Sequence, residues 1–243
     1  MKDIVTRIRI SSAEGRIPSD QIRAWQENQV KPTAVFMRKA SGRKDIAPYD
    51  SSEIADLKYK VSEADLNAAL AKSLKKSNSN LGINDGRKHR IAFIEAEADG
   101  ITCETLLDTA RKLLGGPDAN KLFISLNPAH YQFKADEKQI EIIETLMPEE
   151  LPTRYVLKFG EEKGLKSKTD ESFTIHLCAC AHLPSGKRIG GLRIELKDQD
   201  DHACIRYTGE FASYITDEEL LENRMHMACE LYQMLIRVLQ ETA

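Results

Sequence analysis

The stretch Thr216-Asp217-Glu218-Glu219, followed by LLENRMHMACELYQMLIRVLQE at residues 220–241, decides the fold of this chain. Its first four residues form a capping box. The Thr216 hydroxyl can accept a hydrogen bond from the third backbone N–H of the helix, and the Glu219 side chain can reach back to the backbone N–H of Thr216. Apolar residues then recur at helical spacing. The stretch therefore predicts one amphipathic helix, about 37 Å long at about 1.5 Å per residue.

Three apolar stretches lie directly before this helix, at residues 172–183, 188–197 and 203–215. Only short turns separate them, and a parallel crossover needs about a dozen residues or more, so these strands must pair antiparallel. A curved antiparallel sheet closed by one long helix is a helix-grip, START-like arrangement, and by architectural analogy we expect an α+β fold of this kind. Earlier strands are expected at 91–96, 122–126, 140–146 and 155–159, with a helix at 104–114.

The first 87 residues are polar and less periodic than the rest. The sequence predicts two parts: an N-terminal polar segment with short helices at 1–87 and a helix-grip-like domain at 88–243. Two roles stay open for the segment, an interaction arm or a cover for the partner subunit of a homodimer. The elements expected in it are a strand at 4–10, a helix at 18–25, a strand at 33–37, a helix at 62–75 and a turn-rich loop at 76–88.

The composition limits the classes of function. Of the 243 residues, 41% are hydrophobic, and the net charge is −3. A nearly neutral chain has no strong field for nucleic acid or an anionic membrane, and no run approaches the ~18 apolar residues of a membrane span. The N-terminus lacks the apolar core of a signal peptide. The five cysteines are an odd number without a disulfide-scaffold spacing, so we expect reduced thiols in a cytoplasmic protein.

His226 and Glu230 lie one turn apart on the predicted C-terminal helix. Residues at i and i+4 share one face of a helix, so an imidazole nitrogen and a carboxylate oxygen from this pair can reach the same metal ion. At about 100° per residue, both fall in the arc opposite to the apolar one. That arc faces either water or a polar cavity, and the sequence leaves both interpretations open.

A second set of soft ligands lies on the strand predicted at 172–183. His176, Cys178, Cys180 and His182 alternate along it and therefore point to one side. Alternate residues are ~6.5–7 Å apart, so the outermost two cannot share one ion, and at most two neighbours can. The set is either one wall of a site or a half-polar sheet face in which the cysteines act as small apolar fillers.

Two more candidates lie near the ends of predicted strands. His130 follows Asn127-Pro128, and this Pro-fixed turn suits a ligand or base as well as an ordinary loop histidine. Glu144 ends the apolar run made by Ile140, Ile142 and Ile143. If the run is buried, the carboxylate needs a partner, and a metal ion is one such partner. Glu161 lies in a charged turn and is most simply solvated.

Taken in this order, the elements resemble the diacetylphloroglucinol/phloretin hydrolase family. Members of that family are zinc enzymes with a helix-grip-like domain that cleave a carbon–carbon bond in acylated phenols. The resemblance covers roughly residues 88–241. It is carried by a strand at Ile91–Ala96, the turn Asp99-Gly100-Ile101-Thr102, a helix at Glu104–Leu114, a strand at Leu122–Leu126 ending in Asn127-Pro128-Ala129-His130, then Ile142-Ile143-Glu144 and His226-Met227-Ala228-Cys229-Glu230.

The resemblance implies a zinc site and a reaction. The implied ligands are His130, Glu144, His226 and Glu230. Glu161 stays a rival for the second of them. The implied reaction is retro-Claisen hydrolysis of a carbon–carbon bond next to a carbonyl, in a small acyl-phenol or β-diketone-like substrate. A nearby acid must protonate the leaving carbon, and the candidates are His176, His182 and Tyr207. The alternative class is a non-catalytic, metal-free helix-grip protein that binds a small hydrophobic ligand.

Overall fold

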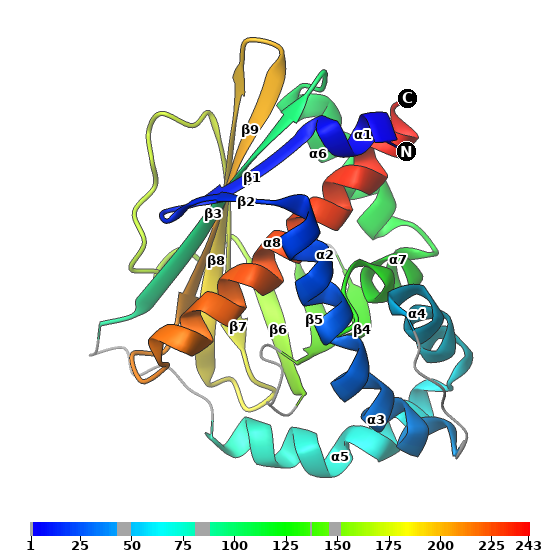
Figure 1. Cartoon of the computed structure of the whole chain (residues 1–243). Helices are drawn as coiled ribbons and strands as arrows, with labels where there is room; N and C mark the ends of the chain where they lie inside the picture. The colour runs from blue at the N-terminus through cyan, green and yellow to red at the C-terminus, as the bar shows by residue number, and fades with distance from the viewer. Residues whose placement is uncertain (1, 43–49, 81–87, 137, 146–151) are drawn as a thin grey trace.

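The computed structural model describes residues 2–42, 50–80, 88–136, 138–145 and 152–243 (Figure 1). The strands within these residues are β1 Ile8–Ser12, β2 Gly15–Ile17, β3 Arg90–Asp99, β4 His130–Ala135, β5 Gln139–Glu144, β6 Thr153–Phe159, β7 Ile175–His182, β8 Arg188–Gln199 and β9 His202–Phe211. The helices are α1 Lys2–Thr6, α2 Ser19–Asn28, α3 Val30–Ser41, α4 Ser51–Lys60, α5 Glu63–Asn80, α6 Cys103–Gly115, α7 Ala119–Leu126 and α8 Asp217–Glu241. None of these helices has the length and apolar content needed to cross a membrane.

The described strands form one antiparallel sheet in the order β2-β1-β3-β9-β8-β7-β6-β5-β4. The long helix α8 crosses its concave side (Figure 1). The predicted capping box is present, because the Thr216 hydroxyl accepts from the backbone N–H of Glu219 at 3.1 Å and the Glu219 carboxylate accepts from the backbone N–H of Thr216. The predicted helix-grip, START-like α+β fold, a curved antiparallel sheet around a long C-terminal helix, is therefore confirmed.

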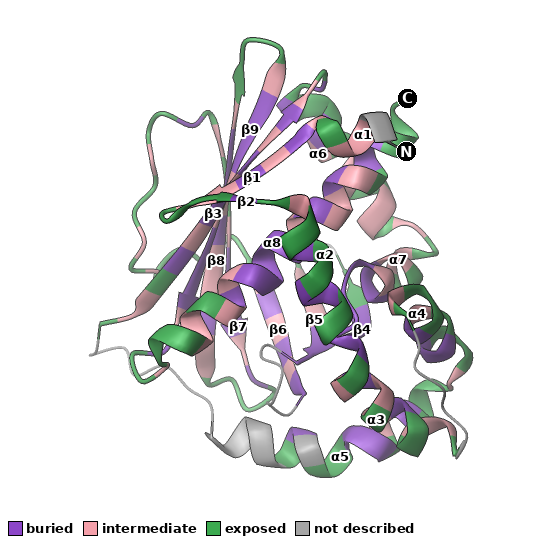
Figure 2. Ribbon diagram, in the orientation of Figure 1, coloured by how far each residue is buried: buried purple, intermediate pink, exposed green. Residues whose placement is uncertain are grey.

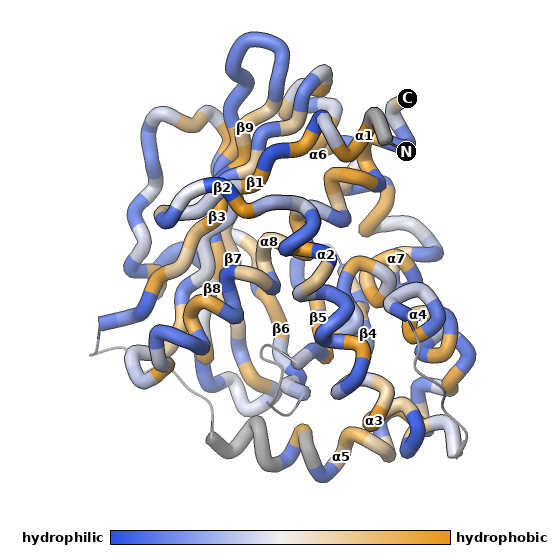
Figure 3. The backbone as a smooth tube through the Cα atoms, viewed as in Figure 1, coloured by the Kyte–Doolittle hydropathy of each residue, from blue (hydrophilic) through white to orange (hydrophobic). Residues whose placement is uncertain are grey.

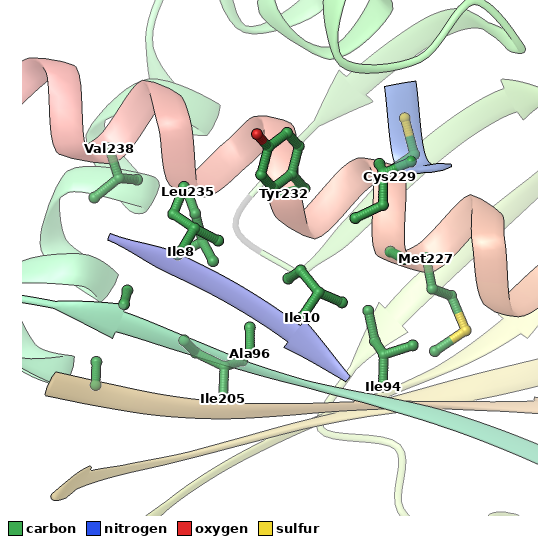
Figure 4. Close-up of a cluster of buried hydrophobic side chains, with 14 of the residues drawn as sticks. Ile8, Ile10, Ile94, Ala96, Ile205, Met227, Cys229, Tyr232, Leu235 and Val238 are labelled. Atoms are coloured by element: carbon green, nitrogen blue, oxygen red, sulfur yellow. The ribbon is translucent and has the colours of Figure 1, made fainter. Parts of the chain in front are cut away.

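The apolar side of α8 packs onto the sheet at its β1–β3–β9 end (Figure 4). Tyr232, Leu235 and Val238 of the helix belong to one buried cluster with Ile10 and Ile205 of the strands. Figures 2 and 3 show buried and apolar residues following this interface, while exposed and hydrophilic residues follow the outer surface. Burial of apolar surface, the main favourable term in folding, thus fixes the helix against the sheet.

Side chains alternate between two faces of this sheet. We call the side toward α8 the helix face; neighbouring positions on it are Ile94, Tyr207 and Ile194. The opposite side is the outer face; neighbouring positions on it are Glu95, Arg206 and Glu195. The connection between β6 and β7 lies on the outer face, because the backbone N–H of Asp170 donates to Glu195 at 2.8 Å and that of Lys166 donates to Glu210 at 2.9 Å.

Two predicted strands are helices in the structure. Residues 122–126 belong to α7, because a short apolar run does not distinguish a strand from a buried helix by periodicity. Residues 33–37 belong to α3, whose buried residues Val30, Thr33 and Met37 follow helical spacing. Pro32 is accommodated in the first turn of this helix, where its missing N–H has no intrahelical partner to lose.

The N-terminal residues depart from the prediction in two further ways. Ile4 and Val5 lie in α1, and the strand begins only at Ile8. Residues 76–80, expected in a loop, continue α5, and the rest of that expected loop up to residue 87 lies outside the described residues. β1 pairs with β3, so strands from both sides of residue 88 share one sheet, and the division of the chain there stays a prediction.

The helices α3 and α5 pack against β4 and β5. Met37, Leu57 and Leu70 form a buried cluster with Tyr131 of β4 and Ile143 of β5. The sequence did not predict α4 or β4. Together these N-terminal helices cover the sheet edge at which β4 begins.

Candidate metal centre

Four of the residues singled out from the sequence meet at one point between α8 and the edge of the sheet. His130 opens β4 and Glu144 closes β5, and the two are cross-strand partners. His226 and Glu230 project from α8 above them. One ligand atom from each of the four lies within 4.8 Å of all the others. We refer to His130, Glu144, His226 and Glu230 as the four-residue cluster.

The imidazole of His130 is the centre of this cluster. Its Nε2 atom lies 2.7 Å from Glu230 Oε1, 3.3 Å from Glu144 Oε2 and 3.3 Å from His226 Nε2. His226 Nε2 in turn lies 3.3 Å from Glu230 Oε1 and 3.5 Å from Glu144 Oε2. Both imidazoles therefore direct the same nitrogen toward both carboxylates.

The orientation of the His130 ring is set by helix α7. Its Nδ1 atom lies 2.8 Å from the carbonyl oxygen of Phe123, and the two rings stack with centroids 3.9 Å apart. A carbonyl oxygen only accepts, so Nδ1 carries the proton, and in the neutral ring the lone pair lies on Nε2. A backbone carbonyl that fixes the tautomer of a histidine in this way is the usual outer partner of a metal-bound imidazole.

The cluster is buried. His130 is 0% exposed, Glu144 and His226 are each 3% exposed, and the Glu230 side chain retains 18%. The interpretation of His226 and Glu230 as a surface pair is therefore wrong. Helix α2 covers the polar arc of α8. The Trp25 indole N–H donates a hydrogen bond to the Glu222 carboxylate at 2.7 Å. The Trp25 and His226 rings meet edge-on, with their centroids 5.8 Å apart.

Two tyrosines contact the carboxylates of the cluster. Tyr155 donates a hydrogen bond to Glu144 Oε1, and Tyr207 lies 3.4 Å from Glu230 Oε2. Burial raises the pKa of each phenol well above its ordinary value, and the neighbouring carboxylates raise it further. Both hydroxyls thus stay protonated and available as donors.

The charges of the cluster are strongly coupled. Burial lowers the pKa of His226, but the carboxylates of Glu230 and Glu144 outweigh burial and raise this pKa to about 10. Burial alone raises the pKa of Glu230, yet His226 and His130 hold it well below its ordinary value. The carboxylates thus favour a positive charge between them.

Some atoms of the cluster are not satisfied by the protein. Glu144 Oε2 and His226 Nδ1 are buried without a hydrogen-bond partner. Among the described residues, the ion pairs of Glu144 and Glu230 involve only His130 and His226, and no lysine or arginine neutralises them. A buried carboxylate oxygen without a donor is costly. The geometry therefore fits a cation at this point.

Of the three candidate proton donors, only Tyr207 is beside the cluster. His176 and His182 lie on the outer face, where His176 Nδ1 is 3.2 Å from Glu195 and His182 Nε2 is 2.8 Å from Glu161. Both histidines lie on the side of β7 that points away from α8, so the structure does not bring them to the cluster. Glu161 lies with His182, so Glu144 is the carboxylate that the structure brings to the other three cluster residues.

Sequence reasoning missed several residues around the cluster. Tyr155 has a local signal, since it is two residues along β6 from Thr153, the cross-strand partner of Glu144, and so shares the face of Glu144. Phe123 was assigned to a strand, which hid its carbonyl as a partner of His130. Trp25 precedes Glu222 by 197 residues, and no local pattern indicates that contact.

Two cavities among the described residues lie away from the cluster. One of about 400 Å³ is at the far end of α8, with Arg7, Thr102, Asp198 and His202 in its walls. Another of about 170 Å³ lies between β1 and Tyr232. Neither is lined by a cluster residue. Glu230 is the most exposed of the four, so solvent reaches the cluster from its side.

Comparison with known proteins gives partial overlaps of structure only. No family model matches the sequence, and no curated protein matches it significantly. The solved structure of Ara h 8.0201 aligns over 62% of this chain and 99% of its own, with 13% identity and a TM-score of 0.41. Protein Ms6760 from Mycobacterium smegmatis aligns over 65% and 99%, with 12% identity and a TM-score of 0.39. The human StarD13 lipid transfer and protein localization domain aligns over 70% and 95%, with 8% identity and a TM-score of 0.33.

Proposed function

We propose that the four-residue cluster binds one zinc ion and that the protein is a zinc-dependent hydrolase. The bond cleaved is a carbon–carbon bond next to a carbonyl, in a small acyl-phenol or β-diketone-like substrate. The observation that carries the metal is the buried convergence of two imidazole nitrogens and two carboxylates without a lysine or arginine partner among the described residues. The reaction rests on the family resemblance of the sequence. A cytoplasmic location, expected from the cysteines, belongs to the same proposal.

The donor set fits zinc. Imidazole nitrogen and carboxylate oxygen are two of its three usual protein ligands. Two buried carboxylates carry two negative charges, and a divalent ion offsets both without a second buried cation. Glu144 Oε2, which has no hydrogen-bond donor, is the atom that such an ion satisfies best.

The residues around the cluster support hydrolysis. Bound zinc supplies Lewis acidity, which polarises a carbonyl and lowers the pKa of water. In the overall reaction, the hydroxyl of water adds to the carbonyl carbon to form a carboxylic acid, and the electron pair of the broken bond goes to the leaving carbon. That carbon must gain a proton. Tyr207 is protonated and beside Glu230, so we assign it as the donor, and the remaining proton of the attacking water then restores its hydroxyl. Tyr155 orients Glu144.

Metal content tests the proposal. The purified protein, equilibrated with Zn²⁺ and then desalted, should contain about one zinc per chain by elemental analysis. His226→Ala should lose it. His182→Ala is the matched control, because His182 also faces a glutamate but lies on the outer face, and it should keep the zinc. A parent protein that retains no metal after this treatment contradicts the proposal.

Activity tests the reaction separately. The zinc-loaded protein should release a carboxylic acid from an acetylated polyphenol or from a β-diketone, followed by NMR, and removal of zinc with a chelator should stop the release. Tyr207→Phe should lower kcat with little change in zinc content. Zinc binding with no hydrolysis of either substrate would leave a structural metal and refute the enzymatic part.

A second function has its own supporting observation. Leu177 is 38% exposed although it lies on the helix face, and register places it beside Ile194 and then Tyr207. This apolar row suits a small hydrophobic ligand, whether a substrate or the cargo of a non-catalytic binding protein. The fluorescent probe 1-anilinonaphthalene-8-sulfonate discriminates: in the non-catalytic case, parent and His226→Ala bind it equally and zinc has no effect on its affinity.

A further inference from the structure

The turn that carries His130 is held by side chains from three N-terminal helices. Gln26 of α2 donates to the carbonyl of Leu126 at 3.3 Å, and Thr33 of α3 donates to that of Pro128 at 2.9 Å. Lys58 of α4 donates both to Pro128 and to the carbonyl of His130 itself. Residues separated by 70 to 100 positions in the chain thus converge on one five-residue turn.

Lys58 is an unusual member of this set. It is 4% exposed, and its Nζ atom lies 4.9 Å from the ring centroid of Tyr131. Among the described residues, no carboxylate forms an ion pair with it. Burial lowers the pKa of this amino group well below its ordinary value, and a buried polar group is costly unless it is hydrogen-bonded. An apolar side chain suffices for docking α4, as Ile54 and Leu57 of the same helix show by their burial. The amino group of Lys58 adds two bonds to the carbonyls that flank Ala129.

These bonds complete the fixation of His130. Its backbone N–H donates to the carbonyl of Asn127 at 3.0 Å, its ring is held by Phe123, and its carbonyl is held by Lys58. Backbone and ring are therefore both fixed before any metal binds. Ligand orientation by groups outside the first coordination sphere typically changes metal affinity about 10–100-fold.

We propose that Lys58 is a positioning residue of the metal centre, through the carbonyls of Pro128 and His130. The inference rests on the proposed metal site. It assigns the N-terminal helices a role in that site, in place of an independent interaction arm.

Co²⁺ titration of the full chain tests this role. The chain contains a single tryptophan, Trp25, next to His226, so paramagnetic quenching of its fluorescence reports occupancy of the cluster. Lys58→Met keeps the length of the side chain and removes the donors. We expect its dissociation constant for Co²⁺ to rise about 10–100-fold. Ile54→Ala is the matched control, because it weakens the docking of α4 without touching either carbonyl, and its dissociation constant should stay within about twofold of the parent despite a lower Tm.

Each result of the Co²⁺ titrations either supports or overturns the role of Lys58. If the parent binds Co²⁺ and Lys58→Met binds it as tightly, Lys58 is a structural residue only and the inference is overturned. An equal loss of affinity in Ile54→Ala overturns it as well, because docking alone then explains the effect. If the parent itself binds no Co²⁺, the proposed function fails and the inference with it. Should Lys58→Met not fold, Thr33→Val removes the other donor to Pro128, and the same titration should show a loss of a few-fold, with no loss overturning the inference.

Discussion

Two buried glutamates lie on opposite faces of the sheet, and their surroundings differ. Glu144 on the helix face is 3% exposed, and Glu210 on the outer face is 2% exposed. Glu210 accepts hydrogen bonds from the backbone of Lys166 at 2.9 Å, from the backbone and hydroxyl of Ser167, and from His89 at 2.8 Å. Glu144 accepts one from Tyr155, and its second oxygen has no donor.

The difference shows that a buried carboxylate beside an imidazole is not by itself a metal site. At Glu210 the chain supplies enough donors, and although burial raises its pKa, the hydrogen bonds from Ser167 and His89 hold the pKa below the ordinary value. At Glu144 only one oxygen has a donor, and the charge that offsets the two cluster carboxylates comes from imidazoles, whose protons a metal ion can displace.

Two smaller groups of possible ligands on the outer face follow the pattern of Glu210. Their members are Glu97, His202 and Cys204, and Glu161, Cys180 and His182. Glu97 already binds the guanidinium of Arg9 at 2.7 Å. The thiol of Cys180 lies against Arg188, and burial, the larger effect, raises its pKa. Each group thus has an arginine beside one of its members, whereas the cluster carboxylates have none among the described ion pairs, which makes the four-residue cluster the stronger candidate.

The largest expected effect separates the two glutamates directly. Glu144→Gln removes a ligand charge, and we expect zinc affinity to fall more than about 100-fold, beyond the range for changes outside the first coordination sphere. Glu210→Gln makes the same chemical change on the other face and should leave zinc affinity unaltered. Competition with a chromophoric chelator measures both. Equal zinc affinities in the two variants would contradict the view that Glu144 is a metal ligand and Glu210 is not.

A smaller effect is expected at Tyr155. Its hydroxyl is the donor that orients Glu144, and Tyr155→Phe removes it while the ring stays in place. Zinc affinity should fall about 10-fold, at the lower end of the range for outer partners. The matched control is Tyr131→Phe. Tyr131 is also a buried tyrosine at the same sheet edge, but its hydroxyl makes no described hydrogen bond to a cluster carboxylate. The same chelator competition gives the answer, and an unchanged affinity in Tyr155→Phe would mean that Glu144 needs no orientation.

The sequence predicted those elements that local chemistry determines. The capping box and spacing of α8 and the antiparallel pairing of β7, β8 and β9 need only neighbours along the chain. The four cluster residues were also found, but through their order in a family pattern. Their burial was not predictable, because it depends on Trp25 and α2, which cover the polar arc of α8 from about 200 positions away.

The incorrect predictions for other residues also arise because contacts between residues far apart in the chain determine their structure. The run at 122–126 is short and, apart from Ser125, apolar, so its period does not distinguish a strand from a helix, and packing on Phe133 and neighbouring residues selects the helix. His176 and His182 were correctly placed on one side of a strand, but a single strand does not indicate which side faces the helix. Lys58 and Tyr155 contribute through bonds to distant residues, and their own sequence surroundings carry no sign of this.

On the outer face, the expected effect is on stability. Glu210→Gln removes the charge that strengthens its bonds to the β6–β7 connection, and hydrogen bonds to charged groups contribute about 1.5–3 kcal/mol. We expect the free energy of unfolding to fall by about 1.5 kcal/mol in urea titrations of the metal-free protein. Glu171→Gln, an exposed position on the same connection, should change it by less than about 0.5 kcal/mol. A Glu210→Gln variant as stable as the parent would contradict the view that the chain itself satisfies this carboxylate.

The smallest expected effect is the pH dependence of the stability difference between the parent and Glu210→Gln. It distinguishes the contribution of the Glu210 charge from that of its hydrogen-bond geometry. The pKa of Glu210 is lower in the folded protein than its ordinary value of 4.5, so its charge contributes stability above that value, and this contribution is lost as the pH falls toward the folded-state pKa. Glutamine does not titrate. The stability gap between parent and Glu210→Gln should therefore be constant from pH 7 to about pH 6 and narrow as the pH falls below the ordinary carboxyl pKa. Urea titrations at closely spaced pH values measure this gap, with Glu171→Gln as the reference. A gap that stays constant through acid pH would show that the hydrogen-bond geometry of Glu210, and not its charge, holds the β6–β7 connection to the sheet.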